Sequence, residues 1–253
     1  IITLDFETYY SQAFSLSKLT TEEYVRDDQF EVIGVSVKEN DGETKWYSGT
    51  HNEILGFLSS YDWDNSFVLA HNAMFDMAIL NWQFDIRPKA IVDTLSMARA
   101  IHGTEVGGSL KVLAQHYGVG EKGDEVLKME GKRRIDISPS DMVAYGEYCK
   151  TDVVLTLGIF EKMVGYFPME ELRLIDLTIR MFSEPALTLD TEVLNDHLDD
   201  IKFKKETLLK GGLVRESLMS NDKFAGLLEA YGVEPPRKIS PTTGKETWAF
   251  AKT

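Results

Sequence analysis

The chain has 253 residues, of which 43% are hydrophobic and 27% are charged, and its formal net charge is −14. This size and apolar content allow one large domain, or one medium domain followed by an extension. No apolar run approaches the length of a membrane-spanning helix, no signal-peptide pattern opens the chain, and the single cysteine excludes an internal disulfide. We therefore expect a cytoplasmic protein with no membrane partner.

Strand and helix patterns alternate through the first two thirds of the chain. Residues 1–7, 31–38 and 43–48 are β-prone, and Asn40-Asp41-Gly42 has the composition of a hairpin turn. Two more strands are expected at 66–71 and 91–94, and helices at 51–61, 74–82, 94–103 and 108–117. A surface loop is expected over 118–139, after which Ser140 is expected to cap a helix of about two dozen residues. This alternation predicts an α/β domain.

The pattern changes at Pro168, beyond which we expect helices and no strands. We therefore expect a domain over residues 1–168 and a helical segment over 169–253. Asp190 is expected to cap a helix of this segment, and Gly232 to end a later one. The chain starts at Ile1 without a methionine, and no residue pattern in its tail marks the end of a folded segment. We therefore expect it to be part of a longer protein.

Four carboxylates and one tyrosine are the candidate functional residues. Asp5 and Glu7 lie two apart in a predicted strand, so they project to the same face. Asp76 falls in the first turn of a predicted helix, where an acid that complements the helix dipole is common. Tyr148 and Asp152 lie four apart on a predicted helix and share a face. Because hard divalent cations choose oxygen ligands, the carboxylates together favour a Mg²⁺ or Mn²⁺ site.

The segments that hold these five residues resemble the Exo I, Exo II and Exo III motifs of the DnaQ-like 3′–5′ exonucleases. The form Tyr148-x-x-x-Asp152 is similar to the tyrosine-containing (DEDDy) branch. Ribonuclease D-like enzymes and the proofreading domains of family A and family B DNA polymerases share that pattern. The resemblance implies an α/β ribonuclease H-like (DnaQ-like) exonuclease fold, with a mixed central sheet flanked by helices and a C-terminal helical extension.

The resemblance also implies a role for each residue. Asp5 would bridge two divalent metal ions, Mg²⁺ or Mn²⁺, and Glu7 and Asp152 would complete the tighter of the two sites. Asp76 would hold the second ion, and Tyr148 would aim the attacking water. The reaction implied is hydrolysis of the 3′-terminal phosphodiester, which releases a nucleoside 5′-monophosphate.

Three further residues match positions that line the pocket for the terminal nucleotide in the family, namely Thr8, Asn72 and Phe75. Phe75 could stack on a base, or it could be a core aromatic residue. Asp93 precedes a predicted helix, so we expect it to act as a cap rather than as a metal ligand. Cys149 is expected to point away from the helix face that Tyr148 and Asp152 share and to serve packing.

A second resemblance concerns the polymerase context. Residues 184–190 are similar to the segment that leads from exonuclease into thumb in family A polymerases, and residues 223–253 to the continuing thumb region. Residues 17–24 are similar to bacteriophage-encoded versions. The implied partners are a single-stranded 3′ end of DNA and the palm and fingers domains of the same longer chain, in the cytoplasm of a bacterial host. The palm and fingers motifs are absent from this sequence, so we expect no polymerase activity.

Two alternatives stay open. A free-standing ribonuclease D-like exoribonuclease would share the catalytic residues but prefer RNA. A catalytically silent DnaQ-fold module would only bind nucleic acid or a protein partner. The net charge of −14 is unusual for a nucleic-acid-binding protein, although bound cations would offset it locally. We expect this chain by itself to bind nucleic acid weakly.

Overall fold

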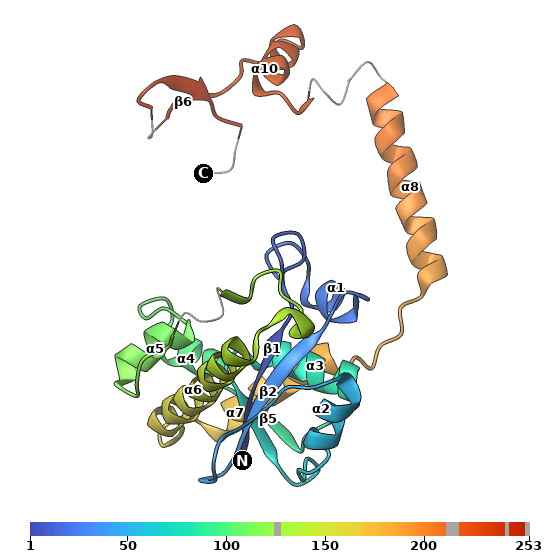
Figure 1. Cartoon of the computed structure of the whole chain (residues 1–253). Helices are drawn as coiled ribbons and strands as arrows, with labels where there is room; N and C mark the ends of the chain where they lie inside the picture. Colours follow the sequence, from blue (N-terminus) through green and yellow to red (C-terminus); the bar gives the residue numbers. More distant parts are fainter. Residues whose placement is uncertain (124–127, 211–217, 241–242, 251–253) are drawn as a thin grey trace. The chain divides into compact units, whose positions relative to one another are not determined.

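The structure is a computed structural model that describes residues 1–123, 128–210, 218–240 and 243–250. The chain divides into two compact units, Ile1–Ala186 and Leu187–Thr253, which are described separately below (Figure 1). Within the described ranges, no helix combines the length and apolarity needed to cross a membrane. The first unit extends past Pro168 to Ala186. The expected domain boundary at residue 168 stays a prediction.

The first unit is built on a five-stranded mixed sheet with strand order β3-β2-β1-β4-β5. The strands are β1 (Ile2–Thr8), β2 (Val32–Glu39), β3 (Lys45–Tyr47), β4 (Phe67–Ala70) and β5 (Ala90–Asp93). β1 pairs with β2 in antiparallel and with β4 in parallel orientation, and Asp5 lies opposite Ser36. The hairpin turn is formed as expected, with Asn40 in a left-handed conformation at φ 48°. The mixed central sheet is thereby confirmed.

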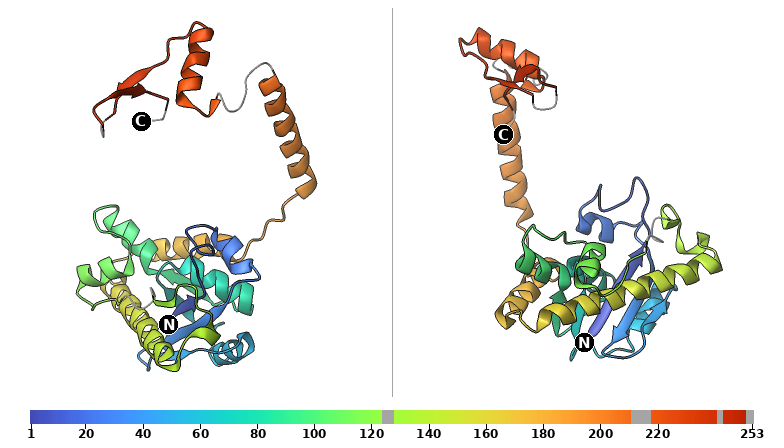
Figure 2. Two further views of the ribbon diagram at one scale, coloured as in Figure 1. Left: turned by 45° about the horizontal axis from the view of Figure 1, so that its top comes forward. Right: turned by 90° about the vertical axis from the view of Figure 1, so that its left-hand side faces the viewer.

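Helices cover both faces of this sheet (Figures 1 and 2). They are α1 (Thr21–Arg26), α2 (His51–Leu58), α3 (Ala73–Phe84), α4 (Thr94–His102), α5 (Leu110–Tyr117), the 3-10 helix η2 (Arg134–Asp136), α6 (Pro139–Val164) and α7 (Met169–Ser183). On one face, Phe6 of β1 stacks on Phe84 of α3 with ring centroids 6.0 Å apart. On the other face, α6 crosses β1, β2 and β3. The side chains of Asp5 and Glu7 lie on the face that α6 covers.

Two helix starts differ from the sequence prediction. α6 is capped by Ser138 rather than Ser140, and the Ser138 hydroxyl accepts from the Asp141 N–H at 3.1 Å. Pro139 makes this start favourable, because its fixed φ suits the first helical position and its missing N–H is not needed there. α1 was not predicted. Its signal was a capping box, in which the Thr20 hydroxyl and the Glu23 carboxylate each accept from the other's backbone N–H.

α7, the last helix of the first unit, packs against the edge strand β5 and against α3. The Asp176 carboxylate accepts from the backbone N–H of Ile91 at 2.8 Å, which satisfies a donor that an edge strand would otherwise expose. The Trp82 indole N–H donates to the Ser183 carbonyl at 2.8 Å. These contacts explain why the first unit continues to residue 186.

The second unit contains α8 (Thr191–Lys210), α10 (Asn221–Ala230) and a hairpin of β6 (Arg237–Ile239) and β7 (Glu246–Trp248). As predicted, the Asp190 carboxylate caps α8 by accepting from the Val193 N–H at 3.1 Å. The expectation of no strands after Pro168 is wrong. Strands of three residues are too short to show a two-residue alternation in the sequence. Residues 211–217, 241–242 and 251–253 of the segment expected to be helical, 169–253, lie outside the described residues.

Close packing of α6 on the sheet depends on a glycine. A Cβ atom at Gly146 would lie 2.5–2.8 Å from three atoms of the Trp46 indole ring of β3. The same indole ring lies 6.1 Å from the Tyr145 ring, measured between centroids. α6 can therefore approach the sheet closely at the turn that precedes its candidate catalytic residues.

Gly146→Ala is expected to lower the free energy of unfolding by about 1–3 kcal/mol, because the new methyl group would overlap the Trp46 ring. Gly56→Ala is the matched control, since nothing lies within 4 Å of a Cβ at this position in α2. It is expected to stabilise by up to about 1 kcal/mol, as alanine is the better helix former. Urea denaturation followed by circular dichroism measures both changes, and equal effects would contradict the tight approach of α6.

Candidate active site

Side chains from β1 and α6 meet in the interior of the first unit. Asp5 is half-buried and Glu7 is buried, and both face α6. One ligand atom each of Asp5, Glu7 and Cys149 lies within 4.8 Å of the other two. This group joins a strand at the start of the chain to a helix about 140 residues later, and its oxygen atoms could hold a hard divalent cation.

Asp76 joins the group from the first turn of α3. Its Oδ1 accepts from the backbone N–H of Phe6 at 3.1 Å, between the two acidic residues of β1. The carboxyl is buried, with 3% of the residue exposed. Burial raises its pKa well above the ordinary value, and the charge of Asp5 raises it further. The hydrogen bond to Phe6 therefore fixes an acid beside Asp5 despite the electrostatic cost.

Asp152 completes the set from α6. It is 2% exposed, and its Oδ2 forms an ion pair with the Lys122 ammonium group. The Tyr148 hydroxyl also interacts with the Asp152 carboxylate, as their spacing of four on the helix predicts. The pKa of Tyr148 is raised, first by burial and then by the Asp152 charge. Lys122 was not among the residues singled out from the sequence, because it lies in a segment that showed only a loop pattern.

Tyr145 is a second residue that sequence reasoning missed. It is fully buried, and its hydroxyl donates to Glu7 Oε2 at 2.6 Å. It precedes Asp152 by seven residues, which is two helical turns, so the two side chains share one face of α6. The spacing of seven residues can be read from the sequence. The contact with Glu7 cannot be predicted from it, because Glu7 lies in a distant strand.

Cys149 was expected only to serve packing, yet its side chain lies at the carboxylate group. Its thiol donates to the Asp5 backbone oxygen at 3.3 Å and lies 3.4 Å from Asp5 Oδ2. The residue is fully buried, and burial together with the Asp5 charge raises the pKa of the thiol. The sequence did not show that the side of α6 that carries Cys149 faces β1.

The crowded carboxylates disfavour their own ionisation. Burial raises the pKa of Asp5 to about 7, and the Asp152 charge contributes to the increase. Glu7 has its pKa raised well above the ordinary value by burial and then by Asp5. Buried acids at this spacing need positive charge to remain ionised. Since all four offer oxygen ligands, the donor set fits a hard divalent cation.

The three predicted substrate-binding residues surround the N-terminal end of α3 and the end of β1. Asn72 is exposed and adopts a left-handed conformation at φ 68°, where its backbone N–H donates to Asp93 Oδ1 at 2.8 Å. The Thr8 hydroxyl hydrogen-bonds with the Tyr24 hydroxyl at 2.9 Å. Phe75 is half-buried, and its ring centroid lies 6.1 Å from that of Tyr24. Their role toward a nucleotide stays a prediction.

Asp93 acts as a cap, as expected. Its carboxylate accepts from the backbone N–H groups of Leu95 and Ser96, at 3.1 and 3.2 Å. The same carboxylate accepts from the N–H groups at the start of α3. One buried acid thereby connects the starts of α3 and α4, and it holds the helix that carries Asp76.

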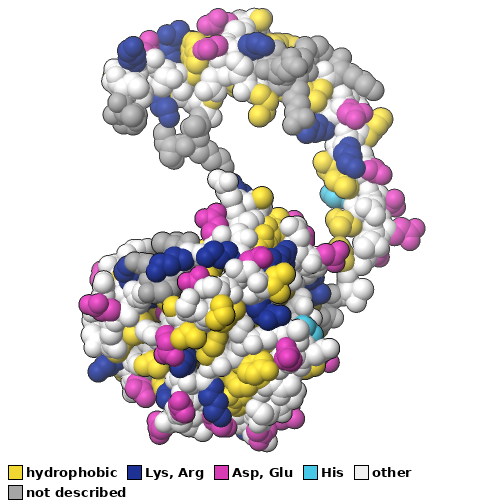
Figure 3. Space-filling view, viewed as in Figure 1, with side chains coloured by type: hydrophobic (Ala, Val, Ile, Leu, Met, Phe, Trp, Pro, Cys, Tyr) yellow, Lys and Arg dark blue, Asp and Glu magenta, His cyan; other side chains and the backbone are white. Residues whose placement is uncertain are grey.

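Two surface pockets border on predicted site residues. One, of about 360 Å³, is lined by Tyr148 together with Glu121, Gly123, Ala144, Glu147 and Thr151. The other, of about 370 Å³, includes Asn72, Asp93 and residues of α4 and α7. On the face of the first unit seen in Figure 3, Lys and Arg side chains gather along the upper part.

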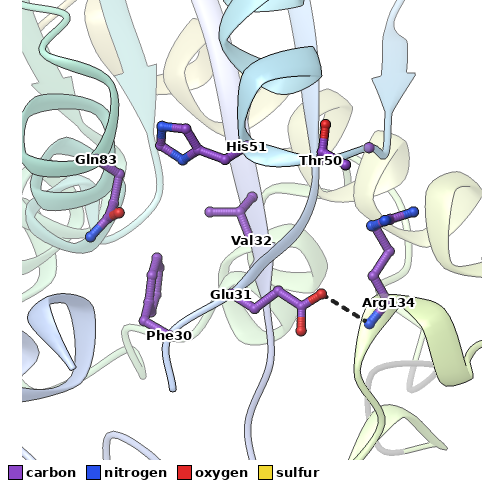
Figure 4. A pocket seen from close by; sticks show the side chains of 8 residues that line it. Phe30, Glu31, Val32, Thr50, His51, Gln83 and Arg134 are labelled. Atoms are coloured by element: carbon purple, nitrogen blue, oxygen red, sulfur yellow. Dashed lines mark hydrogen bonds between the residues drawn. The ribbon is translucent and has the colours of Figure 1, made fainter. Parts of the chain in front are cut away.

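A separate pocket of about 260 Å³ is drawn in Figure 4. Phe30, Val32, His51 and Gln83 surround it, and the backbone N–H of Arg134 donates to Glu31 Oε1 at 3.3 Å on one side. None of the five predicted catalytic residues is among its lining residues. We assign no function to it.

Similar folds occur among solved structures. RNase D from Trypanosoma brucei in complex with RNA U12 has a TM-score of 0.57 and 14% identity, with 74% of this chain and 65% of that chain covered. A further T. brucei RNase D structure has a TM-score of 0.56 and 16% identity, with 74% and 68% covered. This chain thus spans about two thirds of the length of these structures. The likeness confirms the ribonuclease H-like exonuclease fold.

No match was found among curated protein sequences. A family model described as 3′–5′ exonuclease matches residues 21–165, more than half of the 253 residues. The matched region contains Asp76, Tyr148 and Asp152, whereas Asp5 and Glu7 precede it. The chain therefore belongs to the 3′–5′ exonuclease family.

Proposed function

We propose that this chain is a metal-dependent exonuclease that removes nucleoside 5′-monophosphates from the 3′ end of DNA. The observation that carries the proposal is that Asp5 and Glu7 of β1 lie together, that Asp76 of α3 and Asp152 of α6 both interact electrostatically with Asp5, and that Tyr148 hydrogen-bonds with Asp152. We further propose that it is the proofreading part of a family A DNA polymerase. This proposal predicts that DNA is degraded faster than RNA, which is tested below.

Asp5, Glu7, Asp76 and Asp152 would hold two divalent ions, Mg²⁺ or Mn²⁺. When bound, such ions lower the pKa of the attacking water and stabilise negative charge on the attacking and leaving oxygens. The protein contributes the rigid placement of the ligands. The Tyr145 hydroxyl holds Glu7 at 2.6 Å, and the Phe6 N–H holds Asp76 at 3.1 Å. Such supporting hydrogen bonds orient metal ligands and tune their affinity.

Tyr148 would orient the attacking water. A phenol with an ordinary pKa near 10 stays protonated at neutral pH, so its hydroxyl acts as a hydrogen-bond partner rather than as a base. The hydroxyl already interacts with Asp152 and lies beside the pocket of about 360 Å³ described above. Water held between this hydroxyl and the carboxylates would be aligned for attack on the terminal phosphodiester.

Thr8, Asn72 and Phe75 would contact the terminal nucleotide. Asn72 is exposed at the start of α3, four residues before Asp76, and Phe75 is half-buried between them. An aromatic face that stacks on a base contributes about 1–3 kcal/mol to single-stranded binding. The single-stranded 3′ end would thereby reach the carboxylates, and palm and fingers domains of a longer chain would supply it.

The purified chain is expected to shorten a labelled single-stranded DNA from its 3′ end with Mg²⁺ or Mn²⁺, and to stop when EDTA removes the ion. An RNA of the same sequence is expected to be degraded more slowly. Gel analysis of matched DNA and RNA substrates measures both rates. Faster degradation of RNA would support the ribonuclease D-like alternative. A DNA that stays intact with either ion would support the silent binding module.

Asp152→Asn is expected to reduce the cleavage rate on the order of a thousandfold, because a neutral amide is a poor ligand for a divalent cation. The control is Asp64→Asn, which changes an exposed acid before β4 and is expected to leave the rate unchanged. Single-turnover cleavage at saturating Mg²⁺ compares the two variants. Wild-type activity of Asp152→Asn would remove this residue from the proposed metal site.

Tyr148→Phe is expected to lower the cleavage rate by about 10- to 100-fold, the value of one hydrogen bond to a charged or reacting group. Its Mn²⁺ affinity is expected to stay within about threefold of wild type, since no carboxylate is removed. Single-turnover cleavage and isothermal titration measure the two quantities on the same preparation. A full cleavage rate would show that Tyr148 does not orient the water.

A further inference from the structure

Lys122 brings a positive charge into the carboxylate group. Its ammonium forms an ion pair with Asp152 Oδ2 and lies 4.8 Å from the centroid of the Tyr148 ring. The Lys122 side chain is 24% exposed and that of Asp152 is 3% exposed, so the pair is largely shielded from water. A lysine rarely leaves solvent unless a partner compensates its charge. Its position is therefore set by the acids around it.

The environment of Lys122 has excess negative charge. Its charge lowers the pKa of Asp5 and of Glu7, opposing the effect of burial on both. An ammonium group donates hydrogen bonds and accepts none, so it uses the same carboxylate oxygen atoms that a cation would use. A divalent ion and an ammonium group that share one carboxylate repel each other strongly in a partly buried site.

We propose that Lys122 is a positioning residue that occupies the Asp152 carboxylate as a resident counter-ion, and that a divalent ion must displace it in order to bind there. The inference rests on the proposed function, in which Asp152 is a metal ligand. Lys122 keeps the acidic group compact when no ion is bound, and it weakens the binding of the ion. The displaced ammonium group remains at the edge of the pocket beside Tyr148.

The test measures Mn²⁺ affinity of the full 253-residue chain by isothermal titration for wild type, Lys122→Met and Lys122→Arg. Lys122→Met keeps the length of the side chain and removes its charge, so Mn²⁺ is expected to bind about tenfold more tightly. Lys122→Arg keeps the charge and is expected to stay within about threefold of wild type. Lys162→Met, an exposed lysine of α6, is the control and is expected to bind like wild type.

A second measurement separates competition from loss of structure. In EDTA, Lys122→Met is expected to unfold at a lower temperature than wild type, whereas saturating Mn²⁺ is expected to remove most of this difference. A residue with a merely structural role would weaken Mn²⁺ binding when it is replaced. Equal or weaker Mn²⁺ binding by Lys122→Met overturns the proposal, as does a wild type that binds no Mn²⁺.

Failure of this inference and failure of the proposed function are distinguishable. If wild type degrades DNA while Lys122→Met binds Mn²⁺ no more tightly, only the role of Lys122 is overturned. If Lys122→Met binds Mn²⁺ more tightly but wild type cleaves neither DNA nor RNA, the role of Lys122 stands and the nuclease proposal fails.

Discussion

The close approach of α6 to β1 is the constraint on which the candidate site depends. Gly146 leaves room for the Trp46 ring, and the following turns of α6 then lie directly over the acids of β1. The Tyr145 hydroxyl reaches Glu7, and the Cys149 thiol reaches Asp5. A helix one side-chain layer farther away would make neither contact. The acidic residues of β1 would then face water instead of a buried, oriented partner.

This arrangement is electrostatically unfavourable without cations. Four acids are gathered there, and burial raises the pKa of Asp5 to about 7 and the pKa values of Glu7 and Asp76 well above their ordinary values. Hydrophobic packing around them offsets the cost. One apolar cluster includes Phe6 and Phe84, and another includes Met129 beside Tyr145 and Tyr148. Strongly perturbed acids inside a well-packed domain are typical of sites selected for chemistry rather than for stability.

The family match and the structural contacts delimit different parts of the chain. The family model covers residues 21–165, whereas the first compact unit runs from Ile1 to Ala186. β1 is needed because it supplies Asp5 and Glu7, and α7 is needed because Asp176 satisfies the exposed edge of β5. The working unit of the nuclease, as we propose it, is therefore larger than its matched motifs.

Local patterns in the sequence determined the five strands of the first unit, most helices and the faces on which Asp5, Glu7, Tyr148 and Asp152 project. These follow from periodicity and capping, which involve residues only a few positions apart. Only the tertiary structure decided that Lys122 pairs with Asp152, and that Tyr145 and Cys149 support the acids of β1. Lys122 and Asp152 are 30 residues apart in the sequence, and the contacts of Tyr145 and Cys149 with β1 join residues 138 and 144 apart. Such partners are chosen by packing and by the field of several buried charges, and neither has a signature in local sequence.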